Sequence, residues 1–94
     1  MNIITLSGYL CKDPETKTFK EINVCNFSIA VKRKTKTKGE YLTDFFNCVA
    51  FSYPANYIQK YGKKGDKIMI SGNLQNESWE KDGVSRIAAK VFVD

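Results

Sequence analysis

A two-residue alternation between Val24 and Lys34 constrains the fold of this chain more than any other feature. The apolar set is Cys25, Phe27, Ile29 and Val31, and the polar set is Asn26, Ser28 and Lys32, with the small Ala30 between them. Successive side chains of a β-strand point to opposite faces, so the pattern predicts a strand with one buried and one solvated face.

Turn-forming residues divide the rest of the chain into segments of strand length. We expect a first strand over Asn2–Leu10, a second that begins in Phe19–Ile22 and includes Val24–Lys34, and further strands over Tyr41–Phe51, Lys67–Trp79 and Ser85–Val93. Turns are expected at Asp13–Glu15 and Lys81–Gly83, and Gly8 predicts a bulge or bend in the first strand.

One short helix is expected between the third and fourth strands. Ser52 is placed to cap it, Pro54 suits its first turn and Gly62 ends it. Three strands, a helix and two strands predict a single all-β domain over residues 1–94, a five-stranded OB-fold Greek-key barrel. An SH3-like barrel and a mixed α+β sheet are the alternatives.

The excess of positive charge lies in one short segment. The chain has 15 basic and 10 acidic residues, a net charge of +5, and the run from Lys32 to Lys38 contains five basic residues and no acid. These are Lys32, Arg33, Lys34, Lys36 and Lys38. We expect a long hairpin loop that contacts nucleic-acid phosphates, because Lys and Arg neutralise them. The alternative is a solvated loop without a ligand.

Aromatic residues follow the basic run, and aromatic rings are the surfaces on which unpaired bases stack. Trp79 shares a polar strand face with Ser71, Asn73, Gln75 and Glu77, so we expect it to be exposed. The opposite face, with Ile68, Ile70 and Leu74, is expected to enter the core.

Three phenylalanines are ambiguous at this level. Phe45 and Phe51 share one strand face and Phe46 lies on the other, but both faces are mostly apolar, so periodicity does not identify the buried one. Tyr9, Phe19 and Tyr41 are weaker candidates that fit partly exposed packing residues equally well.

The residues argue against several function classes. The chain has no His, no Gly-rich phosphate loop and no carboxylate cluster, so we expect no enzyme activity. Cys11, Cys25 and Cys48 do not match a zinc-site spacing; we expect no metal and no cofactor, with Cys25 and Cys48 buried and Cys11 more exposed. No signal peptide and no membrane-length apolar run is present, which predicts a cytoplasmic protein without a membrane partner.

Eight short segments occur in an order that is more specific than any one of them. They are Asn2–Leu10, Asp13–Glu15, Asn26–Val31, Thr43–Phe51, Tyr61–Gly65, Ser71–Gln75, Ser78–Trp79 and Asp82–Gly83. Together they resemble the bacterial and phage single-stranded DNA-binding protein family over nearly the whole chain. The resemblance implies an OB-fold that binds single-stranded DNA without strong sequence preference, in DNA replication, recombination and repair.

The resemblance also assigns roles to residues. It places base-stacking aromatics at Phe45, Phe51 and Trp79. Tyr9 stands where a polar or basic residue is common and is a possible extra platform, while the positions at 34–36 lack the aromatic that the family often has there. The predicted nucleic-acid-binding residues are Tyr9, Lys12, Lys32, Arg33, Lys34, Lys36, Lys38, Phe45, Phe51, Trp79 and Arg86.

The resemblance further implies partners. Subunits of the family associate partly through their first strands, so Ile3, Ile4 and Leu6 are expected at an oligomer interface, in a tetramer or in a dimer. The sequence stops at Asp94 without the family's acidic tail, and partners recruited by that tail are not expected. The alternatives are a primosome-type accessory protein that acts mainly through protein–protein contacts and an RNA-binding OB module.

Overall fold

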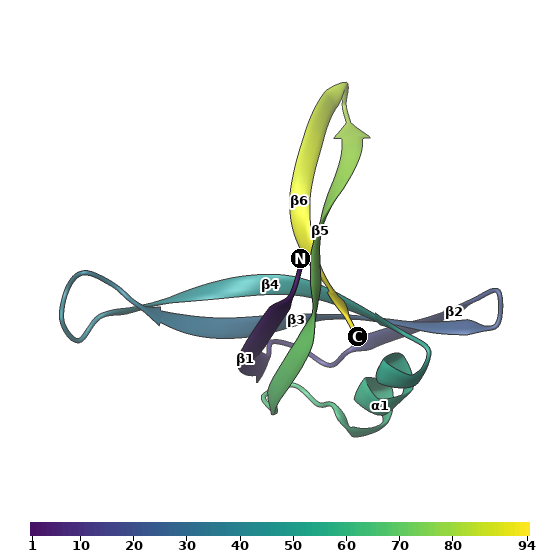
Figure 1. Ribbon diagram of the computed structural model, residues 1–94, viewed down its shortest axis with the longest axis horizontal. Helices are drawn as coiled ribbons and strands as arrows, with labels where there is room; N and C mark the ends of the chain where they lie inside the picture. Colours follow the sequence, from purple (N-terminus) through teal and green to yellow (C-terminus); the bar gives the residue numbers. More distant parts are fainter.

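The computed structural model describes residues 1–94 as six strands and one helix (Figure 1). The elements are β1 (Ile4–Leu10), β2 (Glu15–Phe19), β3 (Ile22–Lys34), β4 (Tyr41–Phe51), α1 (Tyr53–Tyr61), β5 (Lys67–Lys81) and β6 (Val84–Val93). The hairpins β2–β3, β3–β4 and β5–β6 extend in different directions from the centre of the molecule (Figure 1). The structure contains no helix with the length and apolarity needed to cross a membrane.

β1 closes the sheet into a ring because it pairs with two strands at distant positions in the sheet. Its residues Ile4–Tyr9 pair antiparallel with β5, and Tyr9 and Leu10 also pair with Ala30 and Ile29 of β3. The ring order is β1–β5–β6–β4–β3, and β2 lies outside it. Since α1 follows the third ring strand, the prediction of a five-stranded OB-fold with one helix is confirmed.

β2 is an additional strand that was not predicted. It pairs with the start of β3, and Lys20 and Glu21 form the two-residue turn between them. The predicted second strand does begin within Phe19–Ile22, at Ile22, whereas Phe19 is the last residue of β2. Lys20 and Glu21 have φ values of 49° and 66°, the left-handed conformation of a tight hairpin turn. Asn-Gly normally signals such a turn, and Lys-Glu carries no such signal.

The basic run is divided between a strand and a loop. Lys32–Lys34 pair with Tyr41–Thr43, so the predicted strand end at Lys34 is confirmed. The loop expected over residues 32–38 begins too early, since the observed loop spans residues 35–40. The two faces of this two-stranded ribbon are both exposed to water, and its side chains point into the solvent on either face. The charges of Lys32–Lys34 therefore do not prevent the backbone pairing of β3 with β4. The Thr35 N–H donates to the Glu40 carbonyl oxygen at 3.2 Å, which closes the loop.

The core lies inside the ring and against α1. Its buried residues are Leu10, Cys25, Phe27, Ile29, Cys48, Ala50, Ala55, Ile58, Ile70 and Val91. The predicted buried face of β3 is confirmed, and Phe46 and Ile68 pack against the cluster. Leu74 is exposed, contrary to its predicted place in the core, because it lies beyond Gly72, where β5 leaves β1 and continues with β6 alone.

The three cysteines are free thiols with different environments. Cys25 and Cys48 are buried and Cys11 is partly exposed, as predicted. Burial raises the pKa of the Cys48 thiol to about 12; nearby Cys11 adds to the rise and Lys90 opposes it. Burial also raises the pKa of the Cys25 thiol, although a hydrogen bond with Thr16 lowers it in part. Both buried thiols therefore stay protonated at neutral pH and act as small apolar side chains.

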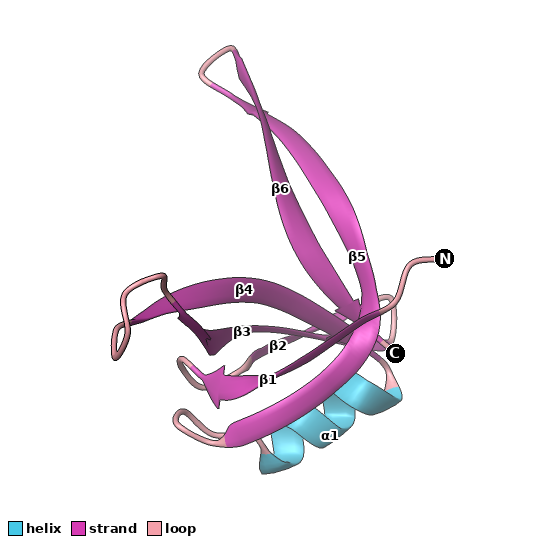
Figure 2. Cartoon of the chain, turned by 60° about the vertical axis from the view of Figure 1, so that its left-hand side comes forward, coloured by secondary structure: helices cyan, strands magenta, loops and turns pink.

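α1 begins at Tyr53 without a side-chain cap. Ser52 has φ 57° and makes no capping hydrogen bond, so the predicted Ser52 cap is wrong. The Ser52 N–H instead donates to the Asn23 carbonyl oxygen at 2.9 Å, which ties the start of the helix to β3. Gly62 follows the helix as predicted, and its N–H donates to Ile58. Figure 2 shows α1 at the opposite end of the molecule from the β5–β6 hairpin.

Gly8 is required by the close approach of β1 and β3. Pairing with β5 continues through Gly8, so the bulge considered for this position is absent. A Cβ there would collide with the Ala30 carbonyl oxygen and lie 2.6 Å from Ile29 Cγ2. The glycine therefore serves the closure of the ring.

We predict that Gly8→Ala destabilises the domain by about 1–3 kcal/mol, the usual cost of overpacking a core. Ser7→Ala, at the exposed neighbouring position, is the control and should change stability by less than about 0.5 kcal/mol. Urea unfolding followed by circular dichroism measures both. Equal midpoints for Gly8→Ala and the parent protein would contradict the close approach of the two strands.

Candidate nucleic-acid interface

The pairing of β3 with β4 settles which phenylalanines face outward. Phe45 lies opposite Ala30, and Phe51 lies opposite Val24, on the face of the sheet that points away from the core. Phe45 is 66% exposed and Phe51 is 43% exposed, whereas Phe46 packs against the core from the other face. The register thus separates Phe45 and Phe51 from Phe46, as the resemblance implied and periodicity could not.

Tyr9 belongs to the same face as Phe45. It pairs with Ala30 from β1, while Phe45 pairs with Ala30 from β4, so the three residues form one row across three strands. Two strand spacings separate the aromatic residues by about 10 Å, and the small Ala30 leaves the space between them open. Both rings are exposed. The row can therefore present two aromatic surfaces to one extended ligand.

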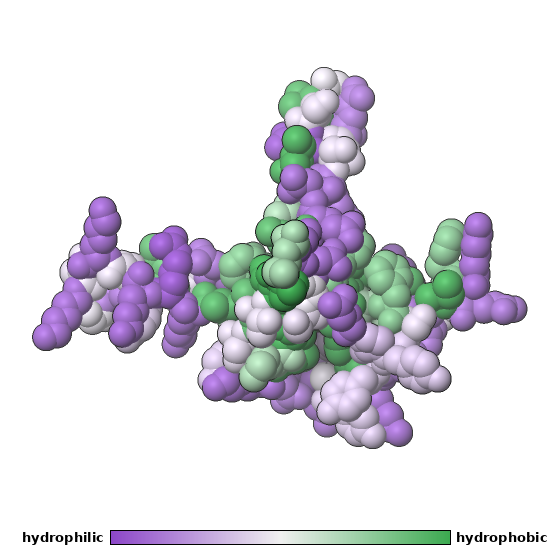
Figure 3. Space-filling view, viewed as in Figure 1, coloured by the Kyte–Doolittle hydropathy of each residue, from purple (hydrophilic) through white to green (hydrophobic).

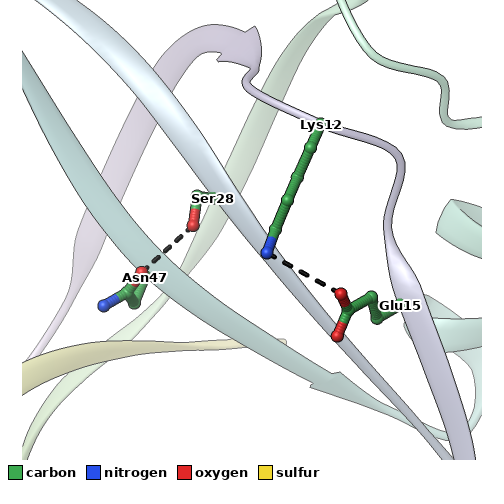
Figure 4. A network of polar contacts seen from close by, with 4 residues as sticks. All are labelled: Lys12, Glu15, Ser28 and Asn47. Atoms are coloured by element: carbon green, nitrogen blue, oxygen red, sulfur yellow. Dashed lines mark hydrogen bonds and ion pairs between the residues drawn. The ribbon is translucent and has the colours of Figure 1, made fainter.

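Trp79 borders a groove between the β3–β4 and β5–β6 hairpins. It is 46% exposed, as predicted, and lies opposite Arg86 in the β5–β6 pair. Asn26, Ser28 and Asn47 line one side of the groove, and Glu77, Trp79 and Lys90 line the other. Ser28 Oγ donates to Asn47 Oδ1 at 3.0 Å, leaving the amide NH₂ of Asn47 free to donate to a ligand (Figure 4).

The acids of this groove are matched by lysines. Lys12 Nζ lies 3.8 Å from Glu15 Oε1 (Figure 4), and Lys90 Nζ lies 3.8 Å from Glu77 Oε2. The groove itself therefore has little net charge. The positive excess is carried instead by the β3–β4 hairpin, which Figure 3 shows as a hydrophilic arm on the left.

The residues of the basic run point in two directions. Lys32 and Lys34 share the outward face with Phe45, because they pair with Thr43 and Tyr41 of the same β4 face. Arg33 points to the other face, where its Nε lies 2.7 Å from Asp44 Oδ2. Lys36 and Lys38 lie in the loop beyond the strands. The structure therefore brings Lys32 and Lys34 to the aromatic face and places Arg33 apart.

Phe92 and Tyr41 extend this face beyond the predicted binding residues. The ring of Phe92 stacks on Phe51 with centroids 6.2 Å apart and an interplanar angle of 20°. Tyr41 is exposed and lies opposite Lys34. Phe92 was missed, although it shares its parity with Arg86 in the last strand, which was a usable signal. We name the surface formed by Tyr9, Tyr41, Phe45, Phe51, Trp79 and Phe92 with Lys32 and Lys34 the aromatic face.

The predicted oligomer residues have different environments. Ile3 is exposed, whereas Ile4 and Leu6 pack partly against the core. One edge of β1 is paired with β5, and the other pairs with β3 only at Tyr9 and Leu10. The backbone of residues 4–8 therefore has one edge without a partner strand.

The ring topology defines an OB-fold protein, and it presents an exposed aromatic face. Comparison with known proteins identifies it further: the chain belongs to the single-strand binding protein family, whose family model matches residues 1–94. The resemblance drawn from the short sequence segments is thus confirmed.

Relatives with the same family name cover the whole chain. A single-stranded DNA-binding protein of Fusobacterium nucleatum is 40% identical over 98 residues, which are 100% of this chain and 64% of the relative. Single-stranded DNA-binding protein 2 of Clostridium acetobutylicum is 35% identical over 97 residues, which are 100% of this chain and 73% of the relative. The chain spans about two thirds of the length of these curated relatives.

A solved structure supports the fold independently. The Plasmodium falciparum SSB complex with ssDNA superposes with a TM-score of 0.90 and 23% identity, over 98% of this chain and 85% of that one. At this identity the match concerns the arrangement of strands and not the roles of individual residues.

Proposed function

We propose that this chain binds single-stranded DNA without marked sequence preference and without catalysing a reaction. The observation that carries the proposal is the aromatic face, which exposes stacking surfaces beside unpaired lysines in a member of the single-strand binding protein family. Stacking is tolerant of sequence because every base has a π face, and each stacked base contributes about 1–3 kcal/mol. The cellular setting proposed is DNA replication, recombination and repair in the cytoplasm.

The predicted binding residues divide into three groups. Bases stack on Tyr9, Phe45, Phe51 and Trp79. Phosphates are neutralised by Lys32, Lys34, Lys36, Lys38 and Arg86. Lys12 and Arg33 are weaker contacts, because each already lies beside an acid, Glu15 and Asp44 respectively. A phosphate that binds to either cation competes with that acid.

The stacking groups are tested by substitution. We predict that Phe45→Ala combined with Trp79→Ala weakens binding of a fluorescein-labelled oligo-dT about 30-fold or more, from at least about 1 kcal/mol per lost stack. Fluorescence anisotropy measures the affinity in every variant, and quenching of Trp79 measures it independently in the parent protein. Tyr61→Ala, which removes an exposed aromatic of α1, is the control.

Three outcomes would contradict the proposed function. The first is that the parent protein does not bind oligo-dT. The second is that it binds duplex DNA or RNA as tightly as it binds oligo-dT. The third is that the doubly substituted protein binds oligo-dT as tightly as the parent protein does. If the parent protein bound duplex DNA but not oligo-dT, its surface would hold DNA by charge and without base stacking.

The lysines of the aromatic face are tested by salt dependence. Each phosphate contact to a single strand contributes about 0.7 to the slope of log affinity against log salt. We predict that Lys32→Ala with Lys34→Ala lowers this slope by about 1.4. Arg33→Ala with Asp44→Ala removes an ion pair without changing the net charge, and should leave the slope within about 0.3 of the parent value. An equal decrease of the salt slope in the two double variants would contradict the distinction between the two faces of β3.

We also propose that the chain forms a homo-oligomer, a tetramer built from dimers, through the free edge of β1. An unpaired strand edge is a template for another strand, and a two-fold interface brings the same surface patch of both subunits together. Sedimentation equilibrium at micromolar concentration should give two or four times 10.7 kDa. Ile3→Lys should weaken the association by bringing like charges together, whereas Ile87→Lys, on β6, should not. A monomer mass for the parent protein would refute the proposal.

A further inference from the structure

The β5–β6 hairpin is attached to the ring over a short distance. The pairing of β5 with β1 ends at Gly72, opposite Ile4, and beyond this point β5 pairs only with β6. On the other side, β6 pairs with β4 at two positions, through Val91 and Phe92. Gly72 has no side chain to brace the hairpin, and a Cβ there would collide with the Phe92 carbonyl oxygen. Few strand pairings therefore fix the orientation of the projecting hairpin (Figure 2).

The side chain of Asn2 continues the β1–β5 ladder beyond Ile4. Asn2 Oδ1 accepts a hydrogen bond from the Leu74 N–H at 2.9 Å, and Asn2 Nδ2 donates to the Leu74 carbonyl oxygen at 2.7 Å. Because Ile4 lies opposite Gly72, the same register places Asn2 opposite Leu74. In an antiparallel ladder, two opposite residues exchange such a pair of N–H···O bonds through their backbones. The carboxamide of Asn2 therefore takes the place of a backbone peptide group.

The hairpin that Asn2 holds forms one wall of the groove described above. Glu77, Trp79 and Lys90 belong to the hairpin, whereas β3 and β4 supply most of the opposite wall. Trp79 lies five residues beyond Leu74, about 17 Å further along β5. Over this length, a rotation of about 10° at Leu74 would move the indole by about 3 Å. The width of the groove is therefore sensitive to the contact between Asn2 and Leu74.

The other side-chain hydrogen bonds of β5 do not hold the hairpin to the ring. Thr5 Oγ1 donates to Ser71 Oγ at 3.4 Å, but this bond lies before the point at which β5 leaves β1. Gln75 Nε2 donates to Asn73 Oδ1 at 2.7 Å, and both residues belong to β5 itself. Asn2 is therefore the side chain that links the end of β1 to the projecting part of the hairpin.

We propose that Asn2 is a positioning residue for DNA binding, whose carboxamide fixes the angle of the β5–β6 hairpin and so the distance between Trp79 and the opposite wall of the groove. The proposal rests on the function proposed above and adds to it a residue that acts without touching DNA. Asn2 acts through the hairpin, because both polar groups of its side chain are bonded to Leu74, which is five residues from Trp79.

A double-mutant cycle tests the coupling, with the affinity for oligo-dT measured by fluorescence anisotropy in the full chain. Asn2→Ala should weaken binding about 3- to 10-fold, because DNA must then restore the orientation that the two hydrogen bonds supplied. In the Trp79→Ala background the same substitution should cost less than about two-fold, because the residue that it positions is gone. In the Phe45→Ala background it should again cost about 3- to 10-fold, because Phe45 lies on β4 and not on the hairpin.

A second measurement follows the hairpin without DNA. Trp79 is the single tryptophan of the chain, so its fluorescence anisotropy decay reports the motion of the hairpin. Asn2→Ala should add a nanosecond component to this decay. Asn2→Asp keeps the shape of the side chain but places a second acceptor against the Leu74 carbonyl oxygen, so it should act as Asn2→Ala does. Thr5→Val removes the bond to Ser71 within the ring and is the matched control, which should change neither the decay nor the affinity.

Several results would overturn the role of Asn2. These are an unchanged affinity or an unchanged anisotropy decay in Asn2→Ala, and equal losses of affinity in the parent and Trp79→Ala backgrounds. A changed oligomer mass in sedimentation equilibrium would also overturn it, because Asn2 adjoins Ile3 of the proposed oligomer interface. Failure of the parent protein to bind oligo-dT would instead overturn the proposed function, while the anisotropy decay would still show whether Asn2 holds the hairpin.

Discussion

The alternation of β3 is the constraint on which the rest of the structure depends. This strand of 13 residues pairs with β1, β2 and β4, so it takes part in the ring and in two of the three projecting hairpins. Its odd-numbered residues from Cys25 to Val31 face the core, and its even-numbered residues lie on the outward side. A slip of one residue would exchange the two faces and bury Asn26 or Ser28 in place of Phe27. Folding and the chemistry of the outer surface are therefore fixed by the same register.

Much of this architecture was predictable because alternation and turn residues are local signals. These signals predicted the order of the ring strands and the helix along the chain, and the exposure of Trp79. The orientation of Phe45, Phe51 and Phe46 did not, because both faces of β4 are apolar and only pairing with β3 separates them. β2 was missed since it is short and ends in a Lys-Glu turn. The separation of Arg33 from Lys32 was also missed, although the predicted strand Val24–Lys34 contains both residues and alternation places them on opposite faces.

Charge and π surface are distributed over different parts of the sheet. In the central groove the acids Glu15 and Glu77 each lie beside a lysine, and the Asn47 amide and the Trp79 ring are uncharged groups that line it. Lys32 and Lys34, which form no ion pair, lie on the β3–β4 hairpin at the side of the aromatic face. Such a division suits a sequence-tolerant ligand, since stacking holds the bases while flexible cations follow the backbone.

The central claim is that one face of the sheet, the aromatic face, holds the unpaired bases. Photo-cross-linking of the intact protein to an oligonucleotide that contains bromouracil, with adducts located by mass spectrometry, tests this claim most directly. The account predicts adducts at Tyr9, Phe45 and Trp79, which come from three different strands. Adducts confined to the exposed tyrosines of α1, Tyr53, Tyr57 and Tyr61, would contradict it, because those rings lie off the aromatic face.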